Sequence, residues 1–166
     1  MRRGRVLGLD PGSRRTGFGL LDWEGPDCRH VAHGCIDVAS EPFAQRLRRI
    51  FEAVSEVIAC HRPDEIAIER VFVDRNADSA IKLGQARGAA ICAVTPGIAV
   101  FEYAPRAVKL AVVGAGGAEK SQVNHMVREL LGVRTVLAAD AADALAVALC
   151  HAHTRRLQDL AARRPA

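Results

Sequence analysis

The sequence has few of the features that mark membrane, secreted or disordered proteins. No stretch approaches the roughly 20 apolar residues that a membrane span requires. The apolar run near the start is cut at Asp10 and Pro11, too early for a signal peptide. The five cysteines form no CxxC pair, so we expect neither a disulfide framework nor a zinc site, and reduced thiols favour the cytoplasm.

Aromatic residues and lysines are also scarce. Only 4% of the 166 residues are aromatic, so an aromatic side chain in a polar loop is a candidate for function. The 23 basic residues outnumber the 19 acidic ones, which permits a polyanionic partner without proving one. Almost all the basic residues are arginine, and the lysines are Lys82, Lys109 and Lys120. A compact, movable charge suits contact with phosphate, and Lys120 opens a helix, a position that favours anions.

The hydrophobic pattern predicts an α/β protein. Apolar runs or alternation predict strands at residues 5–10, 16–23, 30–38, 65–69 and 97–103. Helical spacing predicts helices at residues 41–61, 78–94, 105–113, 119–131 and 140–155. This order is typical of a mixed five-stranded sheet with helices on both faces. We expect one domain over residues 1–157 and a flexible basic tail over residues 158–166.

Four acidic residues lie at the ends of these predicted elements. Asp10 and Glu69 end two strands that we expect to be parallel neighbours, and Asp140 and Asp143 share one face at the start of the last helix. Carboxylates clustered without His or Cys suit Mg²⁺, with Mn²⁺ as a substitute. One or two such ions per subunit could activate water for phosphodiester hydrolysis.

Each of these acids also has a structural interpretation. Asp10 precedes Pro-Gly and is a favoured first residue of a turn, and Glu69 suits a solvated strand end. Asp140 and Asp143 suit the cap and first turn of a helix. Their expected convergence at one edge of the sheet favours a catalytic site.

Other polar and aromatic residues suggest a nucleic-acid surface. Phe72 lies in a polar loop, where it could stack on a base or pack back over the sheet. Arg75 and Asn76 beside it supply donors for phosphates or base edges. The histidines His125, His151 and His153 share no metal-ligand spacing with cysteine, so we interpret them as packing or surface residues.

Four segments resemble the RuvC family of Holliday-junction resolvases, in the ribonuclease H-like superfamily. They are LDPGSRRTGFG, AIERVFVDRNADSAIKLGQARG, VVGAGGAEKSQV and ADAADALAVALCHAH, in family order. The resemblance implies a homodimer that cuts two opposed strands of a four-way DNA junction with divalent metal, beside a branch-migration motor. It implies that the catalytic acids are Asp10, Glu69, Asp140 and Asp143. It also implies a set of DNA-contacting residues: Phe72, Lys82, Gln85, Arg87, Lys109 and Lys120.

The chain departs from the family pattern at a few positions. Arg70 stands where the family commonly has a neutral Gln, Asp74 adds a negative charge beside the predicted DNA contacts, and residues 132–139 are unusually apolar. Two other functions stay open. The first is a nucleotide-binding module, because the segment after the first strand also resembles the phosphate loop of actin-like ATPases. The second is a junction-binding protein without catalytic activity.

Overall fold

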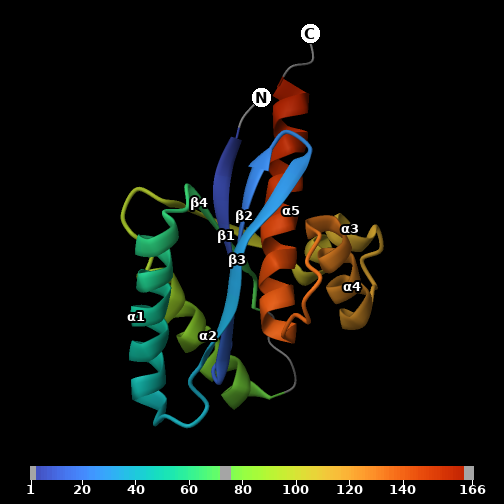
Figure 1. Ribbon diagram of the computed structural model, residues 1–166. Helices are drawn as coiled ribbons and strands as arrows, with labels where there is room; N and C mark the ends of the chain where they lie inside the picture. The colour runs from blue at the N-terminus through green and yellow to red at the C-terminus, as the bar shows by residue number, and fades with distance from the viewer. Residues whose placement is uncertain (1–2, 72–75, 163–166) are drawn as a thin grey trace.

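The computed structural model describes residues 3–71 and 76–162 and contains a five-stranded sheet with helices on both faces (Figure 1). The elements run in the order β1 (Arg3–Asp10), β2 (Arg15–Glu24), β3 (Asp27–Asp37), α1 (Phe43–His61), β4 (Glu65–Glu69), α2 (Ala77–Cys92), β5 (Ala99–Tyr103), α3 (Pro105–Val113), α4 (Lys120–Leu131) and α5 (Ala139–Ala162). The predicted α/β class is confirmed.

The order of the strands places two parallel strands at the centre of the sheet. The spatial order is β3-β2-β1-β4-β5. β1, β2 and β3 pair antiparallel, whereas β4 pairs parallel with both β1 and β5. The carboxyl ends of β1 and β4 therefore lie side by side, which is the edge where ligands bind in open α/β sheets.

Alternation along each strand divides the apolar residues between two cores. Leu7 and Leu9 of β1 belong to the core under α1 and α2, whereas Val6 belongs to the core under α5. In β4, Ile66 and Ile68 face α1 and α2, whereas Ala67 faces α5. Since side chains alternate along a strand, Asp10 and Glu69 also point to the α5 side.

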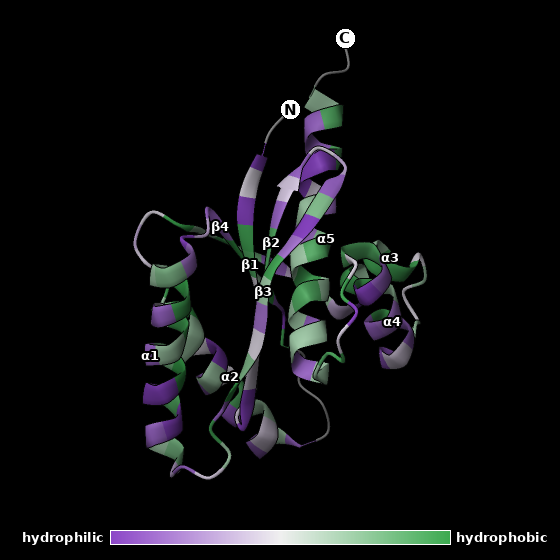
Figure 2. Ribbon diagram, in the orientation of Figure 1, coloured by the Kyte–Doolittle hydropathy of each residue, from purple (hydrophilic) through white to green (hydrophobic). Residues whose placement is uncertain are grey.

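Helix α5 lies directly on the backbone of β1 and β2. A Cβ atom added at Gly8 or Gly17 would collide with backbone carbonyl oxygens of α5, those of Ala144 and Asp140. The helix is buried on all sides from Ala144 to Ala152, and apolar there except for His151, because the sheet covers one side, and α3 and α4 cover the other (Figures 1 and 2). Because Gly8 and Gly17 have no side chain, the start of α5 can lie close to the carboxyl end of β1.

The end of α5 corrects the predicted end of the last helix. The helix runs to Ala162 rather than to residue 155, and it includes the first five residues of the segment 158–166, for which we expect a flexible tail. Ala, Leu, Gln and Arg favour helix, and Arg155 Nη1 donates to Gln158 Oε1 at 3.2 Å across one turn. Residues 163–166 lie outside the described residues. Among the helices described here, none is long and apolar enough to cross a membrane.

Candidate active site

Two acidic side chains project from adjacent strand ends toward α5. Asp10 is the last residue of β1, and Glu69 is the last residue of β4. Both are partly buried, and their strands pair in parallel register from Val6 with Glu65 to Leu9 with Ile68. The register and the shared face bring the two carboxylates to one edge of the sheet.

The first turns of α5 bring two more carboxylates to this edge. Asp143 accepts a hydrogen bond from Lys120 Nζ at 2.8 Å, and the Asp140 carboxylate lies 3.6 Å from Arg15 Nη1. Lys120 is the first residue of α4, whose start is stabilised by a bond of 2.8 Å from Glu119 N to the Gln122 side chain. The lysine side chain remains 78% exposed, so its ammonium can also meet a ligand from solvent.

Neighbouring carboxylates disfavour the charged forms of Asp10 and Glu69. Burial and the negative charges of Asp143, Glu69 and Asp140 together raise the pKa of Asp10 to about 7, against the lowering effect of Lys120. Burial and Asp143 likewise raise the pKa of Glu69. Negative charge therefore exceeds what the neighbouring lysine neutralises, and a bound cation would relieve the excess.

The donor chemistry fits a hard divalent cation. The available ligands are the carboxylate oxygens of the four acids, which Mg²⁺ and Mn²⁺ prefer. Within residues 3–71 and 76–162, no three His, Cys, Asp or Glu side chains form a ready-made metal-binding group. The fit therefore rests on the kind of donor and the unbalanced charge rather than on a preformed cage.

A small cavity connects the acids with two lysines. It measures about 190 Å³, and Glu69, Asp143, Lys109 and Lys120 all line it. The predicted phosphate-binding lysines thus lie beside two of the predicted catalytic acids. Cations at the rim of an anionic cleft suit a polyanionic substrate, because they attract phosphate toward the carboxylates.

Residues around α2 that we predicted to contact DNA have local partners. Asn76 caps α2 by accepting a hydrogen bond from Ser79 N at 3.2 Å. Lys82 pairs with Asp78 at 2.6 Å, and Gln85 is exposed. Arg87 Nε donates to the Glu69 carbonyl oxygen at 3.3 Å and pairs with Glu102. Arg87 therefore supports the strand end that carries a predicted catalytic acid.

The loop between β4 and α2 contains the other residues that the sequence analysis singled out. Phe72, Asp74 and Arg75 lie outside the described residues. Arg70 pairs with Glu102 at 3.8 Å, and its backbone N–H donates to the Tyr103 carbonyl oxygen at 2.8 Å. The charged side chain that replaces the usual Gln is thus drawn toward β5.

Two charged contacts were not anticipated from the sequence. Arg15 joins Asp140 to Asp37, to which it donates at 2.8 Å, because β2 and β3 pair these two positions in register. His151 is fully buried and hydrogen-bonded, although we interpreted it only as a packing or surface residue. The sequence signal was a histidine, a polar residue, in a continuous apolar helix.

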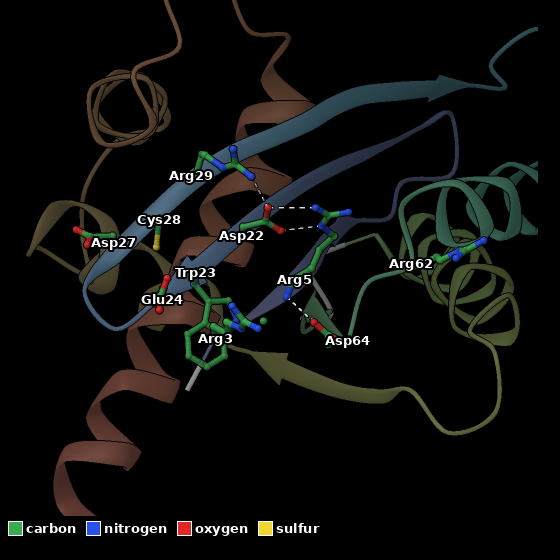
Figure 3. Close-up of a pocket in the computed structure, with 11 residues that line it drawn as sticks. Arg3, Arg5, Asp22, Trp23, Glu24, Asp27, Cys28, Arg29, Arg62 and Asp64 are labelled. Atoms are coloured by element: carbon green, nitrogen blue, oxygen red, sulfur yellow. Dashed lines mark hydrogen bonds and ion pairs between the residues drawn. The ribbon is translucent and has the colours of Figure 1, made fainter. Parts of the chain in front are cut away.

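The larger cavities lie away from these acids. One of about 740 Å³ lies at the opposite end of β1, where Arg5 binds Asp22 and Asp64 (Figure 3). Another of about 730 Å³ lies between α3 and the second half of α5, and Leu110, Leu157 and Leu160 line it. In the first cavity Arg5 and Arg29 lower the pKa of Asp22, and the described residues that line the second include no carboxylate. The small cavity at the strand ends, where the pKa of Glu69 is raised, is therefore the better candidate site.

The fold and the placement of the acids define a nuclease of the ribonuclease H-like class. Residues 6–151 match the family model described as Crossover junction endodeoxyribonuclease RuvC. The chain belongs to this RuvC family. A protein of that name from Methylococcus capsulatus is 60% identical over 153 residues, which cover 92% of each chain. One from Chromohalobacter salexigens is 55% identical over 156 residues, 93% of this chain and 84% of that relative.

Solved structures agree with this assignment. The structure of T. thermophilus RuvC in complex with Holliday junction substrate has a TM-score of 0.87 and 36% identity, covering 93% of this chain and 96% of that one. The yeast mitochondrial Holliday junction resolvase Ydc2 has a TM-score of 0.64 at 12% identity, a likeness of fold alone. Membership of this nuclease family implies dependence on a divalent metal and favours nuclease chemistry over the nucleotide-binding alternative.

Proposed function

We propose that this chain resolves four-way DNA junctions in recombination and repair, by paired symmetric nicks made by a homodimer. In this proposal, residues 1–157 act as a single nuclease domain. The observation that carries the proposal is that Glu69, Asp140 and Asp143 all lie close enough to Asp10 to raise its pKa, at one sheet edge in a member of a junction endonuclease family. A merely structural set of turn and cap residues would not need to gather unbalanced negative charge.

The four acids are the proposed catalytic residues and metal ligands. They would hold one or two Mg²⁺ ions per subunit, with Mn²⁺ as a substitute. When bound, the metal supplies the Lewis acidity that activates water for attack on a phosphodiester. Lys120 and Lys109 bind the phosphate beside the acids, and this role is supported by the cavity that they share with Glu69 and Asp143. Arg15 holds Asp140 in place from the neighbouring strand.

The proposed DNA-binding surface extends from this site along the start of α2. Lys82 and Gln85 are exposed there and can reach the sugar-phosphate backbone. Asn76 and Arg87 contribute mainly by fixing the local backbone, through the cap of α2 and the carbonyl of Glu69. The proposed set is completed by Phe72, Arg75, Lys109 and Lys120.

The symmetry of a four-way junction favours a homodimer. The described part of one chain contains one such candidate site, whereas resolution of a four-way junction needs two opposed cuts, and a two-fold dimer supplies both. Helix α2 is a candidate interface because Ile81 is 61% exposed and a Cβ atom at Gly84 or Gly88 would meet nothing within 4 Å. In the cytoplasm, a branch-migration motor acting on the same junction is the expected partner.

A nicking assay tests the proposal. Purified protein is incubated with a synthetic four-way junction and Mg²⁺, and paired nicks are expected that EDTA abolishes. Asp10→Asn should bind the junction without cutting it. Asp27→Asn is the matched control, because Asp27 is an exposed acid at the start of β3, far from the strand ends that carry Asp10 and Glu69, and the charge change is the same. Equal cutting by both variants would remove Asp10 from catalysis, and junction binding by a wild type that never cuts would favour the non-catalytic alternative.

A further inference from the structure

A buried polar network joins α5 to β4 and β5. The His151 side chain is fully buried, and its Nε2 lies 2.6 Å from Glu65 Oε2 while its Nδ1 lies 2.8 Å from the Tyr103 hydroxyl. Arg155 donates to the same Glu65 carboxylate and covers the Phe101 ring, with 4.4 Å from its guanidinium carbon to the ring centre. Every ring nitrogen of this histidine therefore has a partner on the sheet.

The charges of the network fix the direction of its hydrogen bonds. Burial lowers the pKa of His151, which favours the neutral imidazole. Burial alone would raise the pKa of Glu65, but hydrogen bonds from Arg155 and His151 outweigh it and lower that pKa. The ionised carboxylate can only accept, so His151 donates from Nε2, and its Nδ1 then accepts from the Tyr103 hydroxyl.

The network spans both ends of the ladder between β4 and β5. Glu65 pairs in register with Ala99 at one end, and Glu69 pairs with Tyr103 at the other. Glu65 and Glu69 are separated by about 13 Å along β4, and His151 and Asp143 by about 12 Å along α5. These two lengths are nearly equal. A helix that places His151 beside Glu65 at one end therefore also places Asp143 near Glu69 at the other.

The apolar contacts of α5 fix its distance from the sheet more firmly than its position along the strands. At Gly8 a strand glycine lies against helix alanines, Ala144 and Ala148, whereas Leu145 lies against Gly19. Where glycine meets alanine, no large side chains interlock, so these contacts resist a small slip of the helix only weakly. Directional hydrogen bonds buried in that surface resist a slip, because it would leave an ionised carboxylate unpaired.

We propose that Glu65, His151 and Tyr103 are positioning residues that hold α5 at one register along β4 and β5, and thereby keep Asp140 and Asp143 beside Asp10 and Glu69. None of the three touches the reacting atoms. The inference rests on the proposed function, because a catalytic site requires such positioning. Catalytic groups must be placed more accurately than the distance between adjacent residues of a helix.

Metal binding by the junction-free protein tests this directly. The dissociation constant for Mn²⁺ is measured by electron paramagnetic resonance for wild type, Glu65→Ala and Glu65→Gln. We expect about tenfold weaker binding for Glu65→Ala, because a misplaced α5 no longer presents its two acids correctly. Glu65→Gln should lose much less, because its side-chain carbonyl still accepts from His151.

A matched control separates positioning from loss of stability. Ile50→Ala removes a fully buried side chain from α1, on the opposite face of the sheet, and urea titration gives the folded fraction of each variant. At equal folded fraction, Ile50→Ala should bind Mn²⁺ as wild type does. If Glu65→Ala does not fold, Tyr103→Phe removes only the hydroxyl and should weaken Mn²⁺ binding about threefold.

Two results distinguish the possible failures. Wild-type Mn²⁺ affinity in folded Glu65→Ala, or in Tyr103→Phe where the first variant does not fold, would overturn the positioning role. Single-turnover cleavage of a four-way junction is measured in parallel, and a wild type that binds Mn²⁺ without cutting would overturn the proposed function alone. The comparison of metal affinities would still decide the role of the network.

Discussion

Removing the charge of Asp10 should stabilise the metal-free protein, and more so at alkaline pH. The pKa of this carboxyl is raised from 3.8 to about 7 in the folded protein because burial and neighbouring acids disfavour its charge. The folded state therefore binds the proton more tightly than the unfolded state. Stability is lost as the pH rises from the unfolded pKa to the folded pKa, and the loss is complete above about pH 7.

The size of the effect follows from these two pKa values. Linkage gives a cost of about 1.7 kcal/mol at pH 5 and about 4.3 kcal/mol at pH 8 from ionisation of Asp10. Asn at this position does not ionise, so the constant effects of the substitution cancel between the two pH values. The stability gained by Asp10→Asn should thus be larger at pH 8 than at pH 5 by about 2 to 3 kcal/mol.

Urea unfolding in EDTA measures this difference. Trp23 is the only tryptophan and is 6% exposed, so its fluorescence reports unfolding without a label. Addition of Mg²⁺ at pH 8 should stabilise wild type but have little effect on the variant, because a ligand that binds the folded state raises its stability. A gain that is equal at both pH values, or larger at pH 5, would refute the electrostatic reasoning.

Three further predictions concern α5, the phosphate-binding surface and the dimer. Gly17→Ala should push the start of α5 and Asp140 outward by about 1 Å and slow single-turnover cleavage by roughly 100-fold, whereas Gly117→Ala, whose Cβ has open space, should not. Lys120→Met should weaken junction binding. It should also lower the slope of the logarithm of the dissociation constant against the logarithm of salt concentration by about one. Ile81→Glu should convert the dimer to monomers in analytical ultracentrifugation, with loss of paired nicks.

Each of these three predictions has a contradicting result. Undiminished cleavage by Gly17→Ala would mean that α5 can shift without moving its acids. A salt slope unchanged in Lys120→Met would mean that this lysine serves only its bond to Asp143. A stable dimer of Ile81→Glu would exclude the exposed face of α2 as the interface.

The positions of the acids could be predicted because they depend on local rules. Alternation along β1 and β4 places Asp10 and Glu69 on one face, and helical periodicity places Asp140 and Asp143 at the start of α5. The mixed sheet followed from the same patterns and is confirmed. Each signal is contained within a few consecutive residues, so a single sequence was sufficient.

The remaining features depend on contacts between distant residues. Glu65 and His151 belong to different elements, and nothing near either one in the sequence indicates the other. Asn76 was predicted to contact DNA, yet its side chain also caps α2, since the same donors and acceptors serve both purposes. The length of α5 was underestimated because its last turns have no apolar periodicity against the sheet, although their residues favour helix.

The direct contact between strand glycines and α5 has a consequence for how the enzyme can diversify. Main chain rests on main chain at Gly8 and Gly17, so the gap between the tip of β1 and the first turn of α5 is set by dimensions that all amino acids share. Helices α3 and α4 lie on the other side of α5 and bear Lys109 and Lys120. Natural selection can therefore rebuild this outer layer to suit different junction sequences while the cutting chemistry beneath it is inherited intact.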